Sequence, residues 1–295
     1  MKTDSLKASY AKYIAGLLLF GSNGIVASSI ALSSYEIVFL RTLIGSLLLI
    51  LLFSLGKGKW SFYRHGREFV CLAVSGIAMG TSWMFLYEAY TRIGVSIASL
   101  LYYCGPVIVM ILSPLLFGER LTIFKLLGFA SVLWGVFLVN GSAFHGNGDT
   151  VGILCGLMSA LMYAVMVIFN KKAEHITGLE NAALQLFISF LTVAVFVLFK
   201  QGLALYIPSG SIFPVLLLGL VNTGIGCYFY FSSIGNLPVQ TVAICGYLEP
   251  LSAVLFSVVL LKESMQPLQI IGAVLILGGA VFGECVKRPG AKHGA

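Results

Sequence analysis

Charge is scarce in this chain. Asp, Glu, Lys and Arg together make up 10% of its 295 residues, whereas hydrophobic residues make up 59%. A soluble globular domain has about 25% charged residues. The composition therefore excludes an ordinary soluble domain and indicates a chain that lies mostly in lipid.

The motifs of common enzyme classes are missing as well. The sequence has no G-x-x-x-x-G-K-[ST] loop for nucleotide phosphates, no H-E-x-x-H zinc motif and no G-x-S-x-G nucleophile motif. None of its six cysteines forms a C-x-x-C pair, and its four histidines lie in links or tails outside the apolar runs. These absences predict a protein that is not an enzyme and that has no catalytic residue, no bound metal and no cofactor.

The positive charge of the chain indicates membrane orientation and not nucleic-acid binding. The formal net charge is +7, but the lysines and arginines are spread over short links and tails between apolar runs. A nucleic-acid partner would require them to gather on one face. We therefore expect membrane lipids as partners and no nucleic acid.

Ten apolar runs reach the length of about 20 residues that a helix needs to cross a bilayer. They cover residues 12–31, 36–55, 68–90, 95–117, 123–141, 151–170, 181–200, 212–234, 238–261 and 267–286. With the N-terminus in the cytoplasm, 14 lysines and arginines lie in inside segments and three lie outside. The positive-inside rule therefore predicts a multi-pass protein of a prokaryotic plasma (inner) membrane, with both termini cytoplasmic.

The two halves of the chain repeat each other. A shift of 144 residues aligns positions 36–135 with the second half without a gap, and it matches Tyr103 with Tyr247, Pro106 with Pro250 and Glu119 with Glu263. Each unit holds five runs, an odd number, so the second unit must enter the membrane from the opposite side. We predict an all-α membrane protein of ten transmembrane helices in two inverted five-helix repeats, residues 1–143 and 144–295. Inverted repeats are typical of transporters that bind substrate between the repeats and expose it to each side in turn.

Two corresponding segments resemble a known family. AYTRIGVSIASLLYYCGPVIVMILSPLLFGERLT (89–122), its partner IGNLPVQTVAICGYLEPLSAVLFSVVLLKESM (234–265) and the FLRTLIG stretch (39–45) are similar to EamA-type units of the drug/metabolite transporter superfamily. The resemblance covers nearly the whole chain. It implies ten helices around a central cavity and secondary transport, often export of metabolites or amino acids. The first half departs from the second in having Gly105 where the second has Glu249.

The best candidate for a substrate-binding residue is Glu249, about midway along the ninth run. A carboxylate at that depth is expensive and by default marks a functional site. It could bind a cationic group, exchange protons with the medium, or be held by a neighbouring donor for structural reasons. Pro106 and Pro250 are expected to interrupt the fourth and ninth runs, and Pro250 to free the carbonyl of Gly246 beside Glu249. Both breaks are expected beside a cavity.

Arg41 is the one basic residue well inside a run. Three interpretations stay open: it holds a substrate carboxylate, it pairs with Glu88, or its side chain extends past Glu36 to the membrane surface. Among mid-run aromatic and amide side chains we select Tyr102, Tyr247 and Asn222 as further substrate contacts. An acid beside aromatic walls suits an amphipathic or cationic metabolite.

The sequence thus predicts a secondary transporter that moves small molecules by alternating access. The main alternative is a lipid or carrier-lipid flippase, which could share this architecture. A channel is disfavoured because no ring of repeated polar groups lines a path. Whether the protein is a monomer or a homodimer is not determined by the sequence.

Overall fold

All regular secondary structure is helical in the part of the chain that the computed structural model describes, which covers residues 2–56, 58–93, 95–119, 121–140, 149–202, 206–261 and 267–285. No strand occurs among these residues. The helices of the first half are α1 (Lys2–Gly21), α2 (Asn23–Ser28), α3 (Ser34–Leu55), α4 (Gly66–Ile93), α5 (Val95–Tyr102), α6 (Cys104–Phe117) and α7 (Ile123–Asn140). Those of the second half are α8 (Thr150–Lys171), α9 (Gly178–Gln201), η2 (Ser209–Ser211), α10 (Ile212–Leu217), the π-helical η3 (Leu218–Ile225), α11 (Gly226–Ile234), α12 (Val239–Cys245), α13 (Leu248–Leu261) and α14 (Pro267–Cys285).

Each of the ten apolar runs corresponds to one helix or to one interrupted helix. Single helices match the runs of α3, α4, α7, α8, α9 and α14, whereas the other runs form α1–α2, α5–α6, α10–η3–α11 and α12–α13. Five described segments are long and apolar enough to cross a membrane: α3, α4, α8, most of α9 and the stretch from η2 to α11. The total of ten spans stays a prediction.

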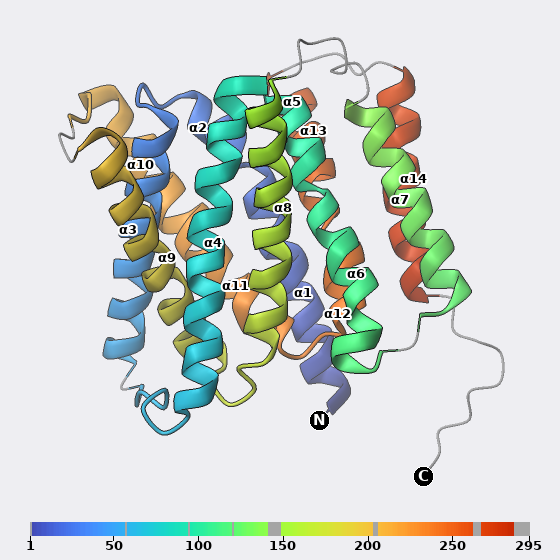
Figure 1. The fold of residues 1–295 in the computed structure, drawn as a ribbon, viewed down its shortest axis with the longest axis horizontal. Helices are drawn as coiled ribbons and strands as arrows, with labels where there is room; N and C mark the ends of the chain where they lie inside the picture. The colour runs from blue at the N-terminus through green and yellow to red at the C-terminus, as the bar shows by residue number, and fades with distance from the viewer. Residues whose placement is uncertain are drawn as a thin grey trace.

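The helices pack in pairs that the 144-residue shift maps onto each other. In the bundle of Figure 1, α3 packs on α9 and α7 on α14, each beside its own counterpart. The same shift relates the contact of α4 with α8 to the contact of α11 with α1. It also relates the contact of α6 with α8 to the contact of α13 with α1. Helix α1 begins and α14 ends at the lower end of the bundle in Figure 1.

Glycine allows α7 and α14 to approach closely. A Cβ on Gly128 would lie 2.5 Å from the carbonyl oxygen of Gly279, and one on Gly135 would lie 2.6 Å from that of Gly272. The two contacts are equivalent under the 144-residue shift, which takes Gly128 to Gly272 and Gly135 to Gly279. Between them, Ser131 donates a hydrogen bond to the carbonyl of Leu275, its own counterpart, over 3.1 Å. Small residues thus let the two backbones touch, as in close helix pairs in lipid.

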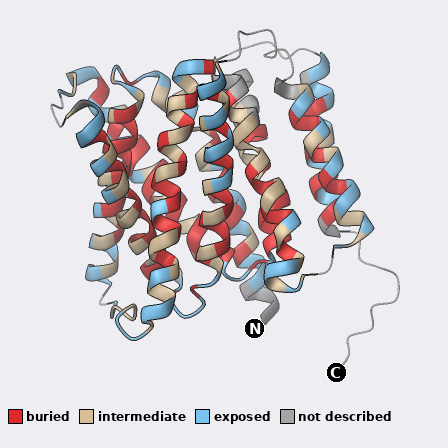
Figure 2. Cartoon of the chain, in the orientation of Figure 1, coloured by how far each residue is buried: buried red, intermediate tan, exposed pale blue. Residues whose placement is uncertain are grey.

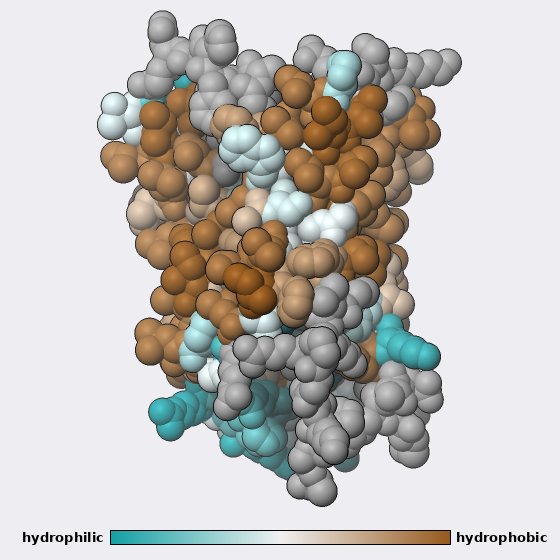
Figure 3. Space-filling view, turned by 90° about the vertical axis from the view of Figure 1, so that its right-hand side faces the viewer, coloured by the Kyte–Doolittle hydropathy of each residue, from teal (hydrophilic) through white to brown (hydrophobic). Residues whose placement is uncertain are grey.

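Large apolar side chains cover the outside of the bundle. Leu115 is 81% exposed and Phe199 85% exposed, while buried residues lie on the inward faces of the helices (Figure 2). Figure 3 shows the face that carries α7 and α14, where hydrophobic atoms cover most of the middle and hydrophilic ones gather at the lower end. An exposed apolar belt of this kind requires a nonaqueous surrounding. The protein is an integral membrane protein.

The interruptions of the fourth and ninth runs differ in one detail from the sequence prediction. Pro106 and Pro250 each lie in the first turn of a new helix, α6 or α13, and not at an internal kink. Proline is tolerated there because the first N–H groups of a helix lack an intrahelical acceptor. The prediction that Pro250 leaves the carbonyl of Gly246 free is also wrong, since this carbonyl accepts a hydrogen bond from the N–H of Glu249 at 3.2 Å.

Candidate functional site

A cavity of about 600 Å³ lies inside the bundle, between helices of the two halves. Its walls come from α1 to α5 of the first half and from α8, α11 and α13 of the second. Many of the lining side chains are aromatic or polar: Phe20, Asn23, Arg41, Trp83, Tyr87, Tyr90, Ser99, Tyr102, Tyr103, Tyr163, Tyr230, Phe231 and Glu249. The volume and the lining match sites for small organic molecules, which span roughly 300–1,000 Å³.

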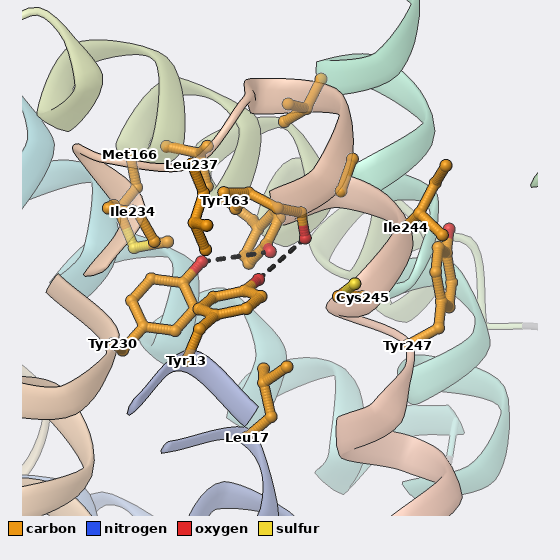
Figure 4. Close-up of a cluster of buried hydrophobic side chains, with 14 of the residues drawn as sticks. Tyr13, Leu17, Tyr163, Met166, Tyr230, Ile234, Leu237, Ile244, Cys245 and Tyr247 are labelled. Carbon is orange, nitrogen blue, oxygen red and sulfur yellow. Dashed lines mark hydrogen bonds between the residues drawn. The ribbon is translucent and has the colours of Figure 1, made fainter. Parts of the chain in front are cut away.

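The cavity reaches the upper end of the bundle and is closed below. Gly24 and Ser28 of α2, which line it, are exposed at the upper end. Toward the start of α1 and α12, at the lower side of the cavity, three tyrosines fill the interior, and Figure 4 shows them pointing toward one another. Tyr13 donates a hydrogen bond to the carbonyl of Val242 at 2.8 Å, and the hydroxyls of Tyr163 and Tyr230 lie 3.3 Å apart. These bonds give the buried hydroxyls partners, and they join α1 to α12 and α8 to α11 at the floor of the cavity.

Glu249 lies in the first turn of α13 and lines the cavity. Within the described chain its carboxylate has no hydrogen-bond or ion-pair partner, although its main-chain carbonyl accepts a bond from the Ser252 hydroxyl at 2.8 Å. Helix α1 packs against this turn at Gly21, where a Cβ would lie 2.8 Å from the Glu249 carbonyl oxygen. The close approach of α1 therefore holds α13 with this acid facing the cavity.

Arg41 faces the same cavity from α3 and is 6% exposed. Its Nε donates a hydrogen bond to the hydroxyl of Thr223 at 2.9 Å, and its guanidinium lies 4.7 Å from the centroid of the Trp83 ring. No carboxylate of the described residues lies within 4 Å of it. The two terminal nitrogens of its planar guanidinium group therefore remain available for a ligand.

Two of the three interpretations of Arg41 are wrong. Glu88 pairs instead with Arg92 at 2.9 Å and with Lys200 at 3.1 Å, and it accepts a further bond from Tyr35. Burial of Arg41 excludes an extension to the membrane surface.

Arg92 also donates a hydrogen bond to Asp149 at 3.1 Å. This bond, and to a smaller extent the bond from the Val151 N–H, holds the pKa of the Asp149 carboxyl below its usual value.

Tyrosine rings form the wall beside Glu249. The Tyr102 ring lies edge-on to Tyr163 at 5.4 Å and tilted against Tyr103 at 5.7 Å, which are usual separations for aromatic pairs. Sequence reasoning selected Tyr102 but missed Tyr90 and Tyr230. Helical spacing carried a signal for both, because Trp83, Tyr87 and Tyr90 follow at i, i+4 and i+7, and Cys227, Tyr230 and Phe231 at i, i+3 and i+4.

Five predicted site residues lie outside the cavity lining. They are Pro106, Asn222, Gly246, Tyr247 and Pro250. Asn222 donates to the carbonyl of Leu19 at 2.9 Å and to the hydroxyl of Ser22 at 2.7 Å, which ties η3 to the end of α1. The prolines, Gly246 and Tyr247 lie at the two helix breaks. Of these five, Asn222 and Tyr247 join helices by hydrogen bonds, Asn222 to the end of α1 and Tyr247 to the carbonyl of Tyr103.

A network of charged side chains closes the lower end of the bundle. Lys171, at the end of α8, donates to the carbonyls of Ile234 and Gly235 at 2.9 Å each, and also to that of Leu237. Glu119 accepts bonds from the N–H groups of Val239 at 2.6 Å and Gln240 at 3.0 Å. Lys125 donates to the Gln240 side chain at 2.9 Å. The network ties the start of α12 to both α8 and the α6–α7 link.

Comparison with known proteins gives matches along nearly the whole chain. The model of the EamA-like transporter family matches twice, at residues 9–141 and 150–282. The "Uncharacterized transporter YxxF" of Bacillus subtilis is 25% identical over 287 residues, which cover 95% of this chain and 90% of that protein. The "Probable amino-acid metabolite efflux pump" of Salmonella typhimurium is 28% identical over 207 residues, 65% of this chain and 69% of that protein. A solved crystal structure superposes with a TM-score of 0.80 over 94% of this chain and 98% of its own, at 19% identity, and so shares the fold.

Proposed function

Since the chain belongs to the EamA-like transporter family, and is therefore a drug/metabolite transporter and not an enzyme, we propose that it carries small amphipathic metabolites with an amino group, amino acids among them. The observation behind this proposal is the Glu249 carboxylate, which faces an aromatic-walled cavity and has no hydrogen-bond or ion-pair partner among the described residues. Glu249, Tyr102 and Arg41 are the binding residues, and Pro106, Asn222, Gly246, Tyr247 and Pro250 support the wall.

The charge of Glu249 explains why a cationic group fits. A carboxylate removed from water is costly unless an opposite charge or hydrogen-bond donors compensate it. An ammonium group of the substrate would supply both. Tyrosine faces attract cations by about 0.5–2 kcal/mol each, so Tyr102 and its neighbours would add to the binding.

Arg41 extends the proposal to substrates that also carry a carboxylate. Its guanidinium can present two parallel N–H groups to the oxygens of one carboxylate. With an acid and a guanidinium in one cavity, both charged groups of an amino acid would find a partner. The Salmonella relative named as an amino-acid metabolite efflux pump supports this class of substrate and the direction of export.

Alternating access would follow from the arrangement of the cavity. In the described conformation the cavity reaches the upper end of the bundle, and the Lys171 and Glu119 network closes the lower end. Opening the lower end requires that α12 separate from Lys171 and Glu119. Relative movement of the two repeats would produce that separation and close the upper end. The prediction of a plasma-membrane protein with both termini cytoplasmic makes the lower end the cytoplasmic one.

The test is a thermal-shift series on the purified protein. Amino acids and hydrophobic amines should raise the melting temperature, because a ligand that binds only the folded state stabilises it by about 2.7 kcal/mol at 100 times its Kd. Matched carboxylic acids without an amino group should raise it less, because they keep the contact with Arg41 but lose the one with Glu249. Glu249→Gln keeps the size of the side chain and should abolish the response, whereas Glu174→Gln, an exposed acid in the α8–α9 link, should preserve it.

Reconstituted vesicles then separate transport from the flippase alternative. The wild-type protein should move a radiolabelled amine or amino acid that raised the melting temperature. Glu249→Gln should lose at least about 90% of that transport rate, since the loss of one charged hydrogen-bond partner weakens binding roughly tenfold or more. If neither amino acids nor hydrophobic amines stabilise the protein and labelled lipids cross the vesicle membrane instead, the proposal is wrong and the flippase is favoured.

A further inference from the structure

Three potential metal ligands meet at the lower end of the bundle, away from the cavity. His65 directly precedes α4, Glu68 lies in the first turn of α4, and His175 lies in the link between α8 and α9. Glu68 Oε1 is 2.6 Å from Nδ1 of His175 and 3.9 Å from Nδ1 of His65. All three ligand atoms lie within 4.8 Å of one another. The cluster joins the first half of the chain to the second.

The carboxylate and the two rings are held in a defined orientation. The N–H of His175 donates a hydrogen bond to Glu68 Oε2 at 2.7 Å, which leaves Oε1 turned toward the imidazoles. The rings of His65 and His175 are parallel, with an interplanar angle of 4° and centroids 4.9 Å apart. Pairing with His175 accounts for the position of Glu68. It does not account for His65, whose Nδ1 faces the same oxygen beyond hydrogen-bond distance.

We propose that His65, Glu68 and His175 form a binding site for a divalent transition-metal ion of the Zn²⁺ class. Two imidazoles and one carboxylate are a common zinc ligand set, with water as the fourth ligand. In a tetrahedral site with bonds of about 2.0–2.1 Å the ligand atoms lie roughly 3.3 Å apart. The separations of Glu68 Oε1 from the two imidazoles, 2.6 and 3.9 Å, lie on either side of that value, and no two of the three ligand atoms are more than 4.8 Å apart, so rotations of the side chains can bring all three to it.

The chemistry of the ligands also sets the selectivity. Mg²⁺ and Ca²⁺ prefer oxygen ligands, whereas imidazole favours Zn²⁺, Ni²⁺ and Cu²⁺. The His175 side chain is 65% exposed and that of His65 35% exposed, so an ion reaches the site from the aqueous phase. A bound ion would cross-link the α3–α4 link to the α8–α9 link. Sequence spacing gave no sign of this site, because His175 lies more than 100 positions from Glu68.

Isothermal titration of the full-length protein in detergent, with any histidine tag removed, tests the site. ZnCl₂ should bind with one ion per chain at this site and raise the melting temperature, and MgCl₂ should do neither. His65→Ala and His175→Ala should each weaken Zn²⁺ binding at least about tenfold, since even second-shell changes at metal sites cost 10–100-fold. Both histidines are at least one third exposed, so the metal-free melting temperatures should stay near the wild-type value.

The matched control is Glu174→Gln, which removes an exposed carboxylate beside His175 and leaves all three ligands in place. It should bind Zn²⁺ as the wild type does. The proposal is overturned if the wild type takes up no Zn²⁺, or if the double variant His65→Ala/His175→Ala binds it equally well. It is also overturned if His65→Ala alone keeps full affinity, because the ion would then not use three protein ligands. None of these outcomes depends on transport activity.

Discussion

The hydroxyl of Tyr247 donates a hydrogen bond of 2.6 Å to the main-chain carbonyl of Tyr103, the residue that occupies the same position in the other half of the chain. Both tyrosines lie at a helix break, Tyr103 between α5 and α6 and Tyr247 between α12 and α13. Their roles nevertheless differ. Tyr247 is 1% exposed and uses its hydroxyl to join the breaks, whereas Tyr103 lines the cavity.

Tyr247→Phe should destabilise the protein. The substitution leaves the Tyr103 carbonyl without this donor at a buried break, and such a loss costs about 1–3 kcal/mol. Tyr103→Phe is the matched control, because among the described residues the Tyr103 hydroxyl makes no hydrogen bond and the carbonyl is unchanged. Thermal unfolding in detergent should show a lower melting temperature for Tyr247→Phe alone. Equal melting temperatures for the two variants would contradict the assignment.

Arg41→Gln should separate two classes of ligand. If Arg41 binds a substrate carboxylate, the variant should lose about tenfold or more in affinity for amino acids, as expected for one charged hydrogen-bonded contact. Affinity for the matching amines, which lack a carboxylate, should not change. Thermal-shift titrations of a paired amino acid and amine measure both. A parallel loss for both ligands would mean that Arg41 holds the shape of the cavity through Thr223 and Trp83.

Glu119→Gln should loosen the lower end of the bundle. The carboxylate accepts bonds from the first N–H groups of α12, where its negative charge also interacts favourably with the helix dipole. Removing the charge should cost about 1–2 kcal/mol. Hydrogen exchange should become faster at Val239 and Gln240 and stay unchanged in α3. Unaltered exchange at the start of α12 would show that Glu119 does not hold the closed end.

Gly279→Ala should weaken the contact of α7 with α14, whereas Gly278→Ala should not. A Cβ on Gly279 would lie 2.5 Å from the Gly128 carbonyl oxygen, but one on Gly278 meets no atom within 4 Å. Overpacking of this kind costs about 1–3 kcal/mol. The neighbouring substitution gains up to about 1 kcal/mol of helix propensity. Melting temperatures of the two variants should therefore move in opposite directions, and a shared direction would argue against a tight crossing.

The predicted topology places both termini in the cytoplasm. A reporter fused after Ala295 should be active as a cytoplasmic reporter, and one inserted between Gly141 and Thr150 should be active on the outside. The fourteen-to-three distribution of lysine and arginine is the basis of this expectation. An external C-terminus would contradict both the topology and the inverted arrangement of the repeats.

The sequence alone determined the features that depend on composition along the chain. Runs of about 20 apolar residues specify helices in lipid, because no water is present to satisfy a free backbone. The 144-residue register located the two repeats, and Pro106 and Pro250 indicated the two interrupted runs, whose breaks lie three residues earlier at Tyr103 and Tyr247. The rarity of charge inside the runs singled out Glu249 and Arg41, and both line the cavity.

Only the tertiary structure decided which way each side chain faces. Asn222 lies in the π-helical η3, and one extra residue in a turn rotates the following residues by about 100° relative to an α-helix, so helical spacing could not place its amide against α1. Arg41 lies beside Thr223 and Trp83 instead of Glu88, because Arg92 and Lys200 already neutralise that carboxylate. His65 and His175 likewise become neighbours only when α4 packs against α8 and α9. Contacts between residues far apart in sequence depend on helix rotation and packing, and these are set by the whole bundle.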